Sequence, residues 1–327
     1  MTHFLVNRLF QFCVTLAGVT VLTFLLMHLA PGDPVDTQAA MNPRISPEAR
    51  ENLKKFYGLD QPLPVQYFNW VGKFLTFNFG YSYTDGKSNS SKILERLPIT
   101  VVINALSLLI IFLVSIPFGI LGAARQNSFF DVSTTFLVFI GFAIPTFWLA
   151  LLLMILFGVQ LGWLPISGYQ SFNAEGFDFW MRLRDWSAHL LMPVLVSAFG
   201  GLAGFSRYLR SEMLEVIRQD YVRTAFAKGL SEKMVLYKHA FRNALIPLVT
   251  ILGLSVPGLI GGSVIFENIY AIPGIGQLFY QSVMQRDYPL IMGLTVIGAI
   301  LTMAGNFLAD IAVALVNPRI KVTEGSR

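Results

Sequence analysis

The chain has 327 residues, of which 54% are hydrophobic and 13% charged, with a formal net charge of +5. A soluble domain carries about 25% charged residues on average, and the mean hydropathy here is +0.59. This composition excludes an ordinary soluble protein and indicates a membrane protein. The single cysteine, Cys13, excludes an intrachain disulfide. Basic loops beside an anionic leaflet account for the positive charge, so we expect a lipid membrane and no nucleic acid as partner.

Six apolar stretches reach or approach the length of about 20 residues that a helix needs to cross a bilayer. They are Leu9–Leu29, Ile99–Ala124, Val132–Gly158, Leu190–Phe205, Ala244–Phe266 and Leu290–Val316, the fourth being the shortest. The first could instead be a signal peptide, but it exceeds the 7 to 15 residues of a signal-peptide core and lacks a clear cleavage pattern. The sequence therefore predicts an all-α membrane protein with six transmembrane helices, the first of them retained.

The distribution of lysine and arginine predicts the orientation, since short cytoplasmic loops are enriched in both. The loops on one side carry Arg8, Arg125, Arg207, Arg210, Arg218, Arg223, Lys228, Lys233, Lys238, Arg242, Arg319, Lys321 and Arg327. The opposite short loops carry Arg182, Arg184 and Arg286. Both termini are therefore expected in the cytoplasm, and the segment Pro31–Pro98 outside as a small, partly helical subdomain.

The predicted spans contain few groups that could carry a proton or an ion. The second to fifth contain no Asp, Glu, Lys or Arg, and the sixth contains Asp310 near its cytoplasmic end. Asp310 is either a proton relay or, as we favour, a carboxylate satisfied by neighbouring helices or by Arg319. His28 and His189 are predicted to pack at span ends. Gly86-Lys87-Ser88 lacks the spacing of a phosphate loop. A chain of this kind is passive or is driven by a partner.

A charged segment, Asp220–Pro247, interrupts the apolar pattern. From Met213 to Ala225 apolar residues recur at helical spacing, which predicts one amphipathic helix. Gly229 is predicted to end it in the left-handed conformation, and the Ser231 hydroxyl to cap a second helix starting at Glu232. Periodicity alone supports equally a docking element for a soluble protein and a solvated hairpin.

Two parts of this segment resemble the EAA loop of type I ABC importer permeases. They are residues 221–230, Tyr-Val-Arg-Thr-Ala-Phe-Ala-Lys-Gly-Leu, and residues 242–247, Arg-Asn-Ala-Leu-Ile-Pro. Further motifs along nearly the whole chain resemble the B-type subunit of the dipeptide and oligopeptide permease family. They are Ala-Pro-Gly-Asp-Pro at 30–34, Ile-Pro-Thr-Phe-Trp at 144–148, Leu-Gly-Trp-Leu-Pro at 161–165, Pro-Gly-Ile-Gly at 273–276, Arg-Asp-Tyr-Pro at 286–289 and Asn-Pro-Arg at 317–319.

The resemblance implies a MetI-like permease fold in a bacterial or archaeal cytoplasmic membrane. Residues 1–98 would form the first helix and external subdomain, 99–317 the transmembrane core with its coupling loop at 207–247, and 318–327 a cytoplasmic tail. The residues implied in coupling to an ATPase are Asp220, Tyr221, Arg223, Thr224, Ala225, Phe226, Lys228, Gly229, Leu230 and Ser231. Phe226 stands where the family usually has Arg, which leaves specific ion pairs at this position in doubt.

The implied function is non-catalytic: one half of the pathway of an ATP-driven importer for di- or oligopeptides. The implied partners are a second, homologous permease, two cytoplasmic ATPases that hold ATP and Mg²⁺, and an extracytoplasmic binding protein; this chain would bind no cofactor or metal. Family members also carry nickel chelates, glutathione or oligosaccharides. The six spans and Asp310 leave open the alternative of a stand-alone secondary transporter. The charged segment leaves open a third function, a scaffold that recruits a cytoplasmic protein. The pore-lining residues are not predicted.

Overall fold

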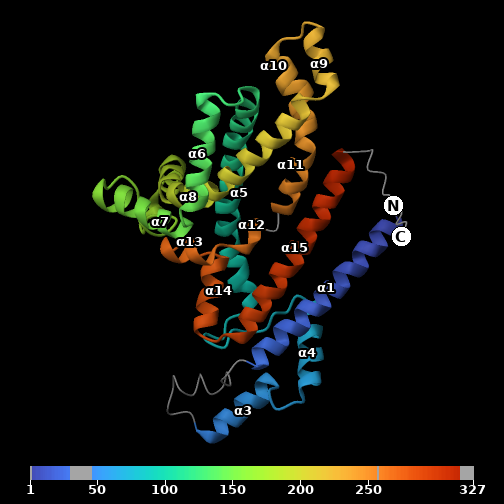
Figure 1. Ribbon diagram of the computed structural model, residues 1–327. Helices are drawn as coiled ribbons and strands as arrows, with labels where there is room; N and C mark the ends of the chain where they lie inside the picture. Colours follow the sequence, from blue (N-terminus) through green and yellow to red (C-terminus); the bar gives the residue numbers. More distant parts are fainter. Residues whose placement is uncertain (1, 30–45, 256–257, 317–327) are drawn as a thin grey trace.

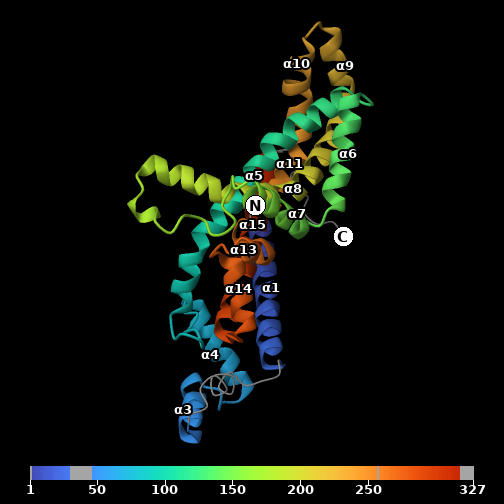
Figure 2. The ribbon, with the colours of Figure 1, turned by 90° about the vertical axis from the view of Figure 1, so that its left-hand side faces the viewer.

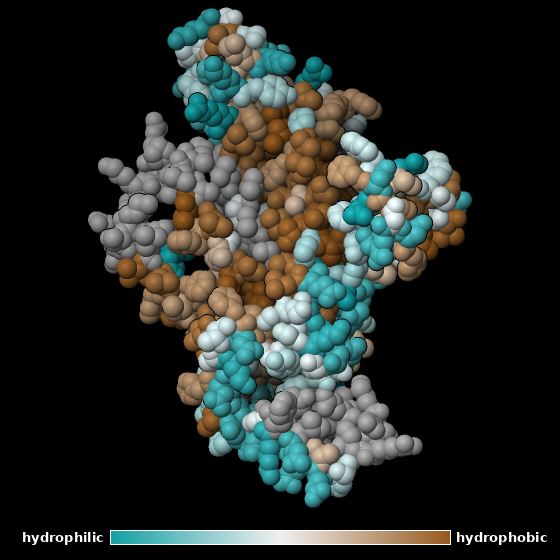
Figure 3. All heavy atoms as spheres, turned by 180° about the vertical axis from the view of Figure 1, so that it is seen from behind, coloured by the Kyte–Doolittle hydropathy of each residue, from teal (hydrophilic) through white to brown (hydrophobic). Residues whose placement is uncertain are grey.

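The computed structural model describes residues 2–29, 46–255 and 258–316 of the chain (Figure 1). Over these residues the fold is all-helical, as predicted, with one isolated bridge between Tyr81 and Ser88. On the face that Figure 3 shows, hydrophobic side chains occupy much of the middle, between hydrophilic ends. The motifs at 30–34 and 317–319, the tail and Arg319 lie outside the described residues.

Within the described residues, four helices are long and apolar enough to cross a membrane, and each contains a predicted span. They are α1 (Thr2–Leu29), α5 (Asn89–Ala124), α8 (Phe179–Ile217) and α15 (Tyr288–Val316). The third predicted span is a pair bent by 98°, formed by α6 (Phe129–Ala143) and by α7 (Thr146–Leu153) with its π-helical continuation η1 (Met154–Gln160). Pro145 explains the bend, because it lacks an N–H and forces Ile144 into an extended conformation. Taken as one span, this pair brings the number to five.

The described parts of the fifth predicted span do not form one continuous helix. They comprise α11 (Phe241–Ser255), α12 (Gly258–Gly261) and the start of α13 (Val264–Ile269). Gly262 has φ +62°, and a Cβ there would lie 2.5 Å from the Gly276 nitrogen. The buried Glu267 carboxylate accepts hydrogen bonds from Thr100 Oγ1 on α5, at 3.0 Å, and from the Gln277 N–H on α14 (Ile275–Met284), at 2.8 Å. This part of the chain therefore turns back on itself beside α5.

The central pair of the core is α5 and α8, which cross in close contact. A Cβ on Gly119 would lie 2.7 Å from Leu209 Cγ, and one on Gly201 would lie 2.3 Å from Ile111 Cδ1. These two glycines let the helices approach. α11 packs against α15 on the other side of the core.

The first helix, α1, packs chiefly against the last, α15. Arg8 near the start of α1 pairs with Asp310 near the end of α15, Nη2 to Oδ2 2.7 Å. A neighbouring helix therefore satisfies the Asp310 carboxylate, which is one of the two ways we expected. His28 and His189 also make local contacts: their Nδ1 atoms lie 2.9 Å from the Phe24 carbonyl and 2.8 Å from the Asp185 carbonyl.

Two hydrophilic elements lie at opposite ends of the molecule (Figures 1 and 2). One is the N-terminal subdomain, described from residue 46 to 98, with α3 (Pro47–Tyr57) and α4 (Leu63–Leu75). The other is the α9–α10 hairpin, residues 218–240, with α9 (Asp220–Ala227), α10 (Glu232–Met234) and the π-helical η3 (Val235–Ala240) leading into α11. A short 3-10 turn, η2 (Ala174–Gly176), precedes α8.

A buried carboxylate anchors the loop before α5, part of the N-terminal subdomain, to the core. Asp287, between α14 and α15, is fully buried. It accepts hydrogen bonds from the Ser82 hydroxyl, from the Tyr83 N–H at 3.1 Å and from Thr84 Oγ1 at 3.3 Å. These contacts join positions more than 200 residues apart and hold the loop before α5 against the start of α15.

Candidate functional site: the α9–α10 hairpin

The hairpin begins with a break that the sequence analysis did not predict. Instead of one amphipathic helix from Met213 to Ala225, α8 ends at Ile217 and α9 begins at Asp220. Gln219 between them is extended, with φ −71° and ψ 147°, and its carbonyl accepts the Val222 and Arg223 N–H groups at 3.0 and 3.2 Å. The prediction of a single helix was wrong because periodicity reports which residues are apolar and does not register a change of helix direction.

The turn of the hairpin agrees with the prediction in two respects and differs in one. Gly229 has φ +77°, and the second helix begins at Glu232, both as predicted. The Ser231 hydroxyl makes no capping hydrogen bond, so that prediction was wrong. The Ser231 carbonyl instead accepts the Val235 N–H at 3.0 Å as the first bond of the new helix.

A core of three buried side chains closes the hairpin. Val222 and Val235 are fully buried and Ala225 is 5% exposed, with Leu230 packed beside them. Ala225 and Leu230, both expected in coupling, thus pack inside the hairpin. Their contribution is to hold α9 against the second helix.

The other eight predicted residues lie on the hairpin surface: Asp220, Tyr221, Arg223, Thr224, Phe226, Lys228, Gly229 and Ser231. The side chains of Asp220 and Arg223 are 98% and 74% exposed, and their charged atoms lie 3.8 Å apart. An exposed pair at this distance contributes little to stability, so both charges are open to a partner. Asn243 Nδ2 donates to the Tyr221 hydroxyl at 2.8 Å, which orients this ring.

Exposed apolar residues complete the hairpin surface. Phe226 and Tyr221 on α9 are each 44% exposed, and so are Met234 and Tyr237 on the second helix. Aromatic residues and methionine are enriched where proteins bind each other. The sequence analysis did not select Met234 or Tyr237; their apolar side chains on a helix otherwise rich in charge were the signal for them. It named Asn243 within the motif at 242–247 but did not predict its contact with Tyr221.

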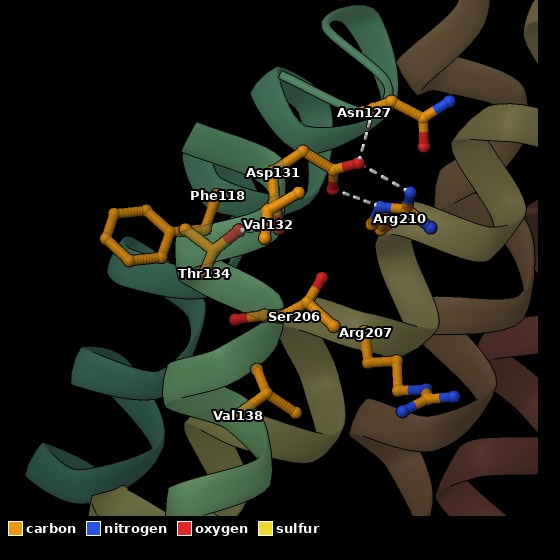
Figure 4. A pocket seen from close by; sticks show the side chains of 10 residues that line it. Phe118, Asn127, Asp131, Val132, Thr134, Val138, Ser206, Arg207 and Arg210 are labelled. Carbon is orange, nitrogen blue, oxygen red and sulfur yellow. Dashed lines mark hydrogen bonds and ion pairs between the residues drawn. The ribbon is translucent and has the colours of Figure 1, made fainter. Parts of the chain in front are cut away.

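A buried ion pair supports the base of the hairpin (Figure 4). Asp131, in the first turn of α6, has a side chain 3% exposed and accepts two hydrogen bonds from Arg210 on α8, one from Nη2 at 2.7 Å. It also accepts the Asn127 N–H at 2.9 Å. A pocket of about 300 Å³, which Ser206 and Arg207 line, lies beside the pair. Arg210 stands ten residues before α9, so the pair fixes the stem of α8 from which the hairpin projects.

The sequence analysis missed this pair because 79 residues separate its members. Arg210 was counted as a marker of topology and Asp131 was not selected. A bidentate contact between a guanidinium and a carboxylate needs both groups in one plane at short range. The local sequence around either residue does not indicate that Asp131 and Arg210 lie together.

The bent and broken helices around a central pair, with a polar hairpin projecting from one end, form a membrane protein of the MetI-like fold. A solved structure described as inward facing conformations of the MetNI methionine ABC transporter matches with a TM-score of 0.50. The match covers 69% of this chain and 96% of that chain at 19% identity, and it shows the fold alone.

The chain belongs to the family "Binding-protein-dependent transport system inner membrane component", whose model matches residues 115–322. The model of the family's N-terminal region matches residues 1–104. The oligopeptide transport system permease protein AppB of Bacillus subtilis is 45% identical over 98% of this chain and all of its own length. A putative peptide transport system permease protein of Brucella abortus and the dipeptide transport system permease protein DppB of Bacillus subtilis are 40% and 36% identical, each over 98% of this chain and 99% of its own length. The chain is therefore a multi-pass membrane protein of a transport system.

Proposed function

We propose that the chain forms one half of the translocation pathway of an ATP-driven ABC importer for di- and oligopeptides. The observation that carries this proposal is full-length similarity to permeases whose names specify oligopeptides, peptides or dipeptides. A second, homologous permease completes the pathway, and an extracytoplasmic binding protein delivers the substrate. Nickel chelates, glutathione and oligosaccharides, which members of the family also carry, are the alternative substrates.

The hairpin is the element that couples ATP hydrolysis to the translocation pathway. Its exposed residues, with Phe226 and Arg223 foremost, dock in a groove of a cytoplasmic ATPase, and two such ATPases bind ATP and Mg²⁺. The permease itself catalyses no reaction and holds no cofactor. When the ATPases close, the hairpin moves with them; the Asp131–Arg210 pair passes this motion through α8 to α6. This arrangement requires the hairpin and both termini in the cytoplasm and the N-terminal subdomain outside.

Two other functions are weaker candidates. A secondary transporter needs a titrating group in the pathway, and the one span carboxylate that the sequence analysis considered, Asp310, is paired with Arg8. A scaffold that recruits a cytoplasmic protein needs no pathway; it would leave peptide uptake intact when the chain is deleted.

The experiment is affinity copurification of the chain from its native membrane in mild detergent, followed by mass spectrometry. We expect a second six-span permease and ATPases with Walker motifs. Uptake of labelled di- to pentapeptides by cells with and without the chain tests the substrate. Recovery of the chain alone, with peptide uptake unchanged in the deletion strain, would overturn the proposal.

A further inference from the structure

A cavity of about 860 Å³ lies between the N-terminal subdomain and two membrane helices. Its walls come from the last turns of α1, from α3 and α4, from the loop before α5 and from the start of α15. The volume is within the range of about 300 to 1,000 Å³ that is typical of ligand sites. None of the residues assigned to coupling lines it.

The wall between α1 and α4 is ordered by direct contacts. The Thr20 and Tyr67 hydroxyls lie 3.0 Å apart, and His28 Nε2 lies 3.1 Å from Gln66 Oε1. The Phe24 ring packs against the rings of Tyr67 and Trp70, with centroids 5.4 and 6.2 Å away. The cavity is thus bounded by a packed wall at the junction of the two helices.

The cavity lies at the ends of two helices that are long and apolar enough to cross a membrane. α1 ends at Leu29 and α15 begins at Tyr288, and residues close to both ends line it. Aromatic rings of Trp70, Tyr81 and Tyr83 line it as well. Tryptophan and tyrosine are enriched at this boundary of a membrane. We therefore expect the cavity at the boundary between the hydrocarbon and water.

The charge of the lining has one sign. Among the described residues that line the cavity, Lys55 and Lys73 are basic and none is acidic. Lys55 is paired with Glu51 at 3.4 Å, but both side chains are more than half exposed, so this pair is weak. The structure describes no ion pair of Lys73. The apolar contribution comes from Phe24, Met27 and Met292.

We propose that this cavity binds an anionic phospholipid, with its phosphate beside Lys55 and Lys73 and an acyl chain along Phe24, Met27 and Met292. A ligand that is both apolar and anionic fits a lining that contains apolar side chains and two lysines. The lipid fills the space between α1, α4 and α15 and so holds the first helix to the rest of the chain. The topology proposed above places the lipid in the outer leaflet; the binding itself does not depend on transport.

The test is native mass spectrometry of the purified full chain in detergent, titrated with phosphatidylglycerol. Each lysine near an anionic headgroup contributes about 1 kcal/mol, so Lys55→Gln and Lys73→Gln should each weaken binding roughly fivefold, and the double variant roughly 25-fold. Lys87→Gln is the matched control, because Lys87 is an exposed lysine of the same subdomain that does not line the cavity. It should bind like the unaltered chain.

Two further ligands separate the contributions of head and tail. Phosphatidylcholine has the same tails and no net charge, and glycerol phosphate has the charge and no tail; both should bind at least tenfold more weakly. Met27→Gln should weaken phosphatidylglycerol while leaving glycerol phosphate unchanged. The proposal is overturned by a double lysine variant that binds phosphatidylglycerol normally. It is overturned equally by glycerol phosphate that binds as tightly as the lipid, which would make this a site for a soluble anion.

Discussion

The two hydrophilic ends of the molecule are built in different ways. The α9–α10 hairpin has a core of three buried side chains within about 15 residues of one another, and eight of its ten predicted coupling residues are exposed. The N-terminal subdomain is held by contacts with other parts of the chain: the fully buried Asp287, more than 200 residues away, and α1, through Thr20 and Tyr67. One end therefore keeps its shape by itself and leaves its surface to a partner, whereas the other takes its position from the membrane core.

The largest effect is expected from Ala225→Glu, which places a carboxylate between Val222 and Val235. An unpaired charge in so small a core destabilises the folded hairpin by about 4 kcal/mol or more, and we expect the hairpin to lose its structure. We expect peptide uptake and copurification of the ATPase to be lost, with membrane insertion unchanged. Ala227→Glu is the control, because Ala227 is exposed. Equal copurification by both variants would contradict the packing described here.

Asp287→Ala tests how the N-terminal subdomain is anchored to the core. Three donors lose a charged acceptor, and we expect a loss of about 3 kcal/mol in the free energy of unfolding. The measurement is the thermal transition in detergent, together with protease cleavage of the N-terminal subdomain, which should become faster. Asp60→Ala removes an exposed carboxylate of the same subdomain, and it should change the transition little. A transition that moves equally in both variants would show that Asp287 is no anchor.

Phe226→Ala probes the surface of the hairpin without disturbing its core. Removing a half-exposed aromatic ring from a docking surface should weaken ATPase binding about tenfold, as measured by titration of the purified ATPase. Lys233→Ala, on the exposed side of the second helix, is the control. Phe226→Arg restores the residue usual in the family. Weaker binding of that variant would indicate a groove adapted to phenylalanine, and unchanged binding of Phe226→Ala would assign the ring no role in docking.

The smallest effect is expected from Gly229→Ala. A Cβ there meets no atom within 4 Å, so the cost is that of the left-handed backbone alone, about 1 kcal/mol. Amide hydrogen exchange across residues 220–240 should rise about fivefold. Gly72→Ala, at an open position inside α4, should cause no such rise. A hairpin with unchanged exchange would mean that its turn is not fixed by Gly229.

The sequence predicted features that a few neighbouring residues determine. The left-handed Gly229, the helix start at Glu232 and four of the spans follow from local composition. The bend at Pro145 carries a local signal that we did not use. The Asp131–Arg210 and Asp287 contacts were missed because they join distant segments. The close approach at Gly201 was missed as well, because its contact with Ile111 depends on how α8 is rotated against α5.

The pairing of α1 with α15 sets the order of assembly during synthesis. Arg8 is made about 300 residues before Asp310, and at 5 to 20 residues per second this interval is roughly 15 to 60 s. The first helix to enter the membrane therefore lacks its main packing partner until the last helix has been made. A ribosome that stalls before α15 would leave an inserted but open permease, whose first helix is available to quality-control proteases.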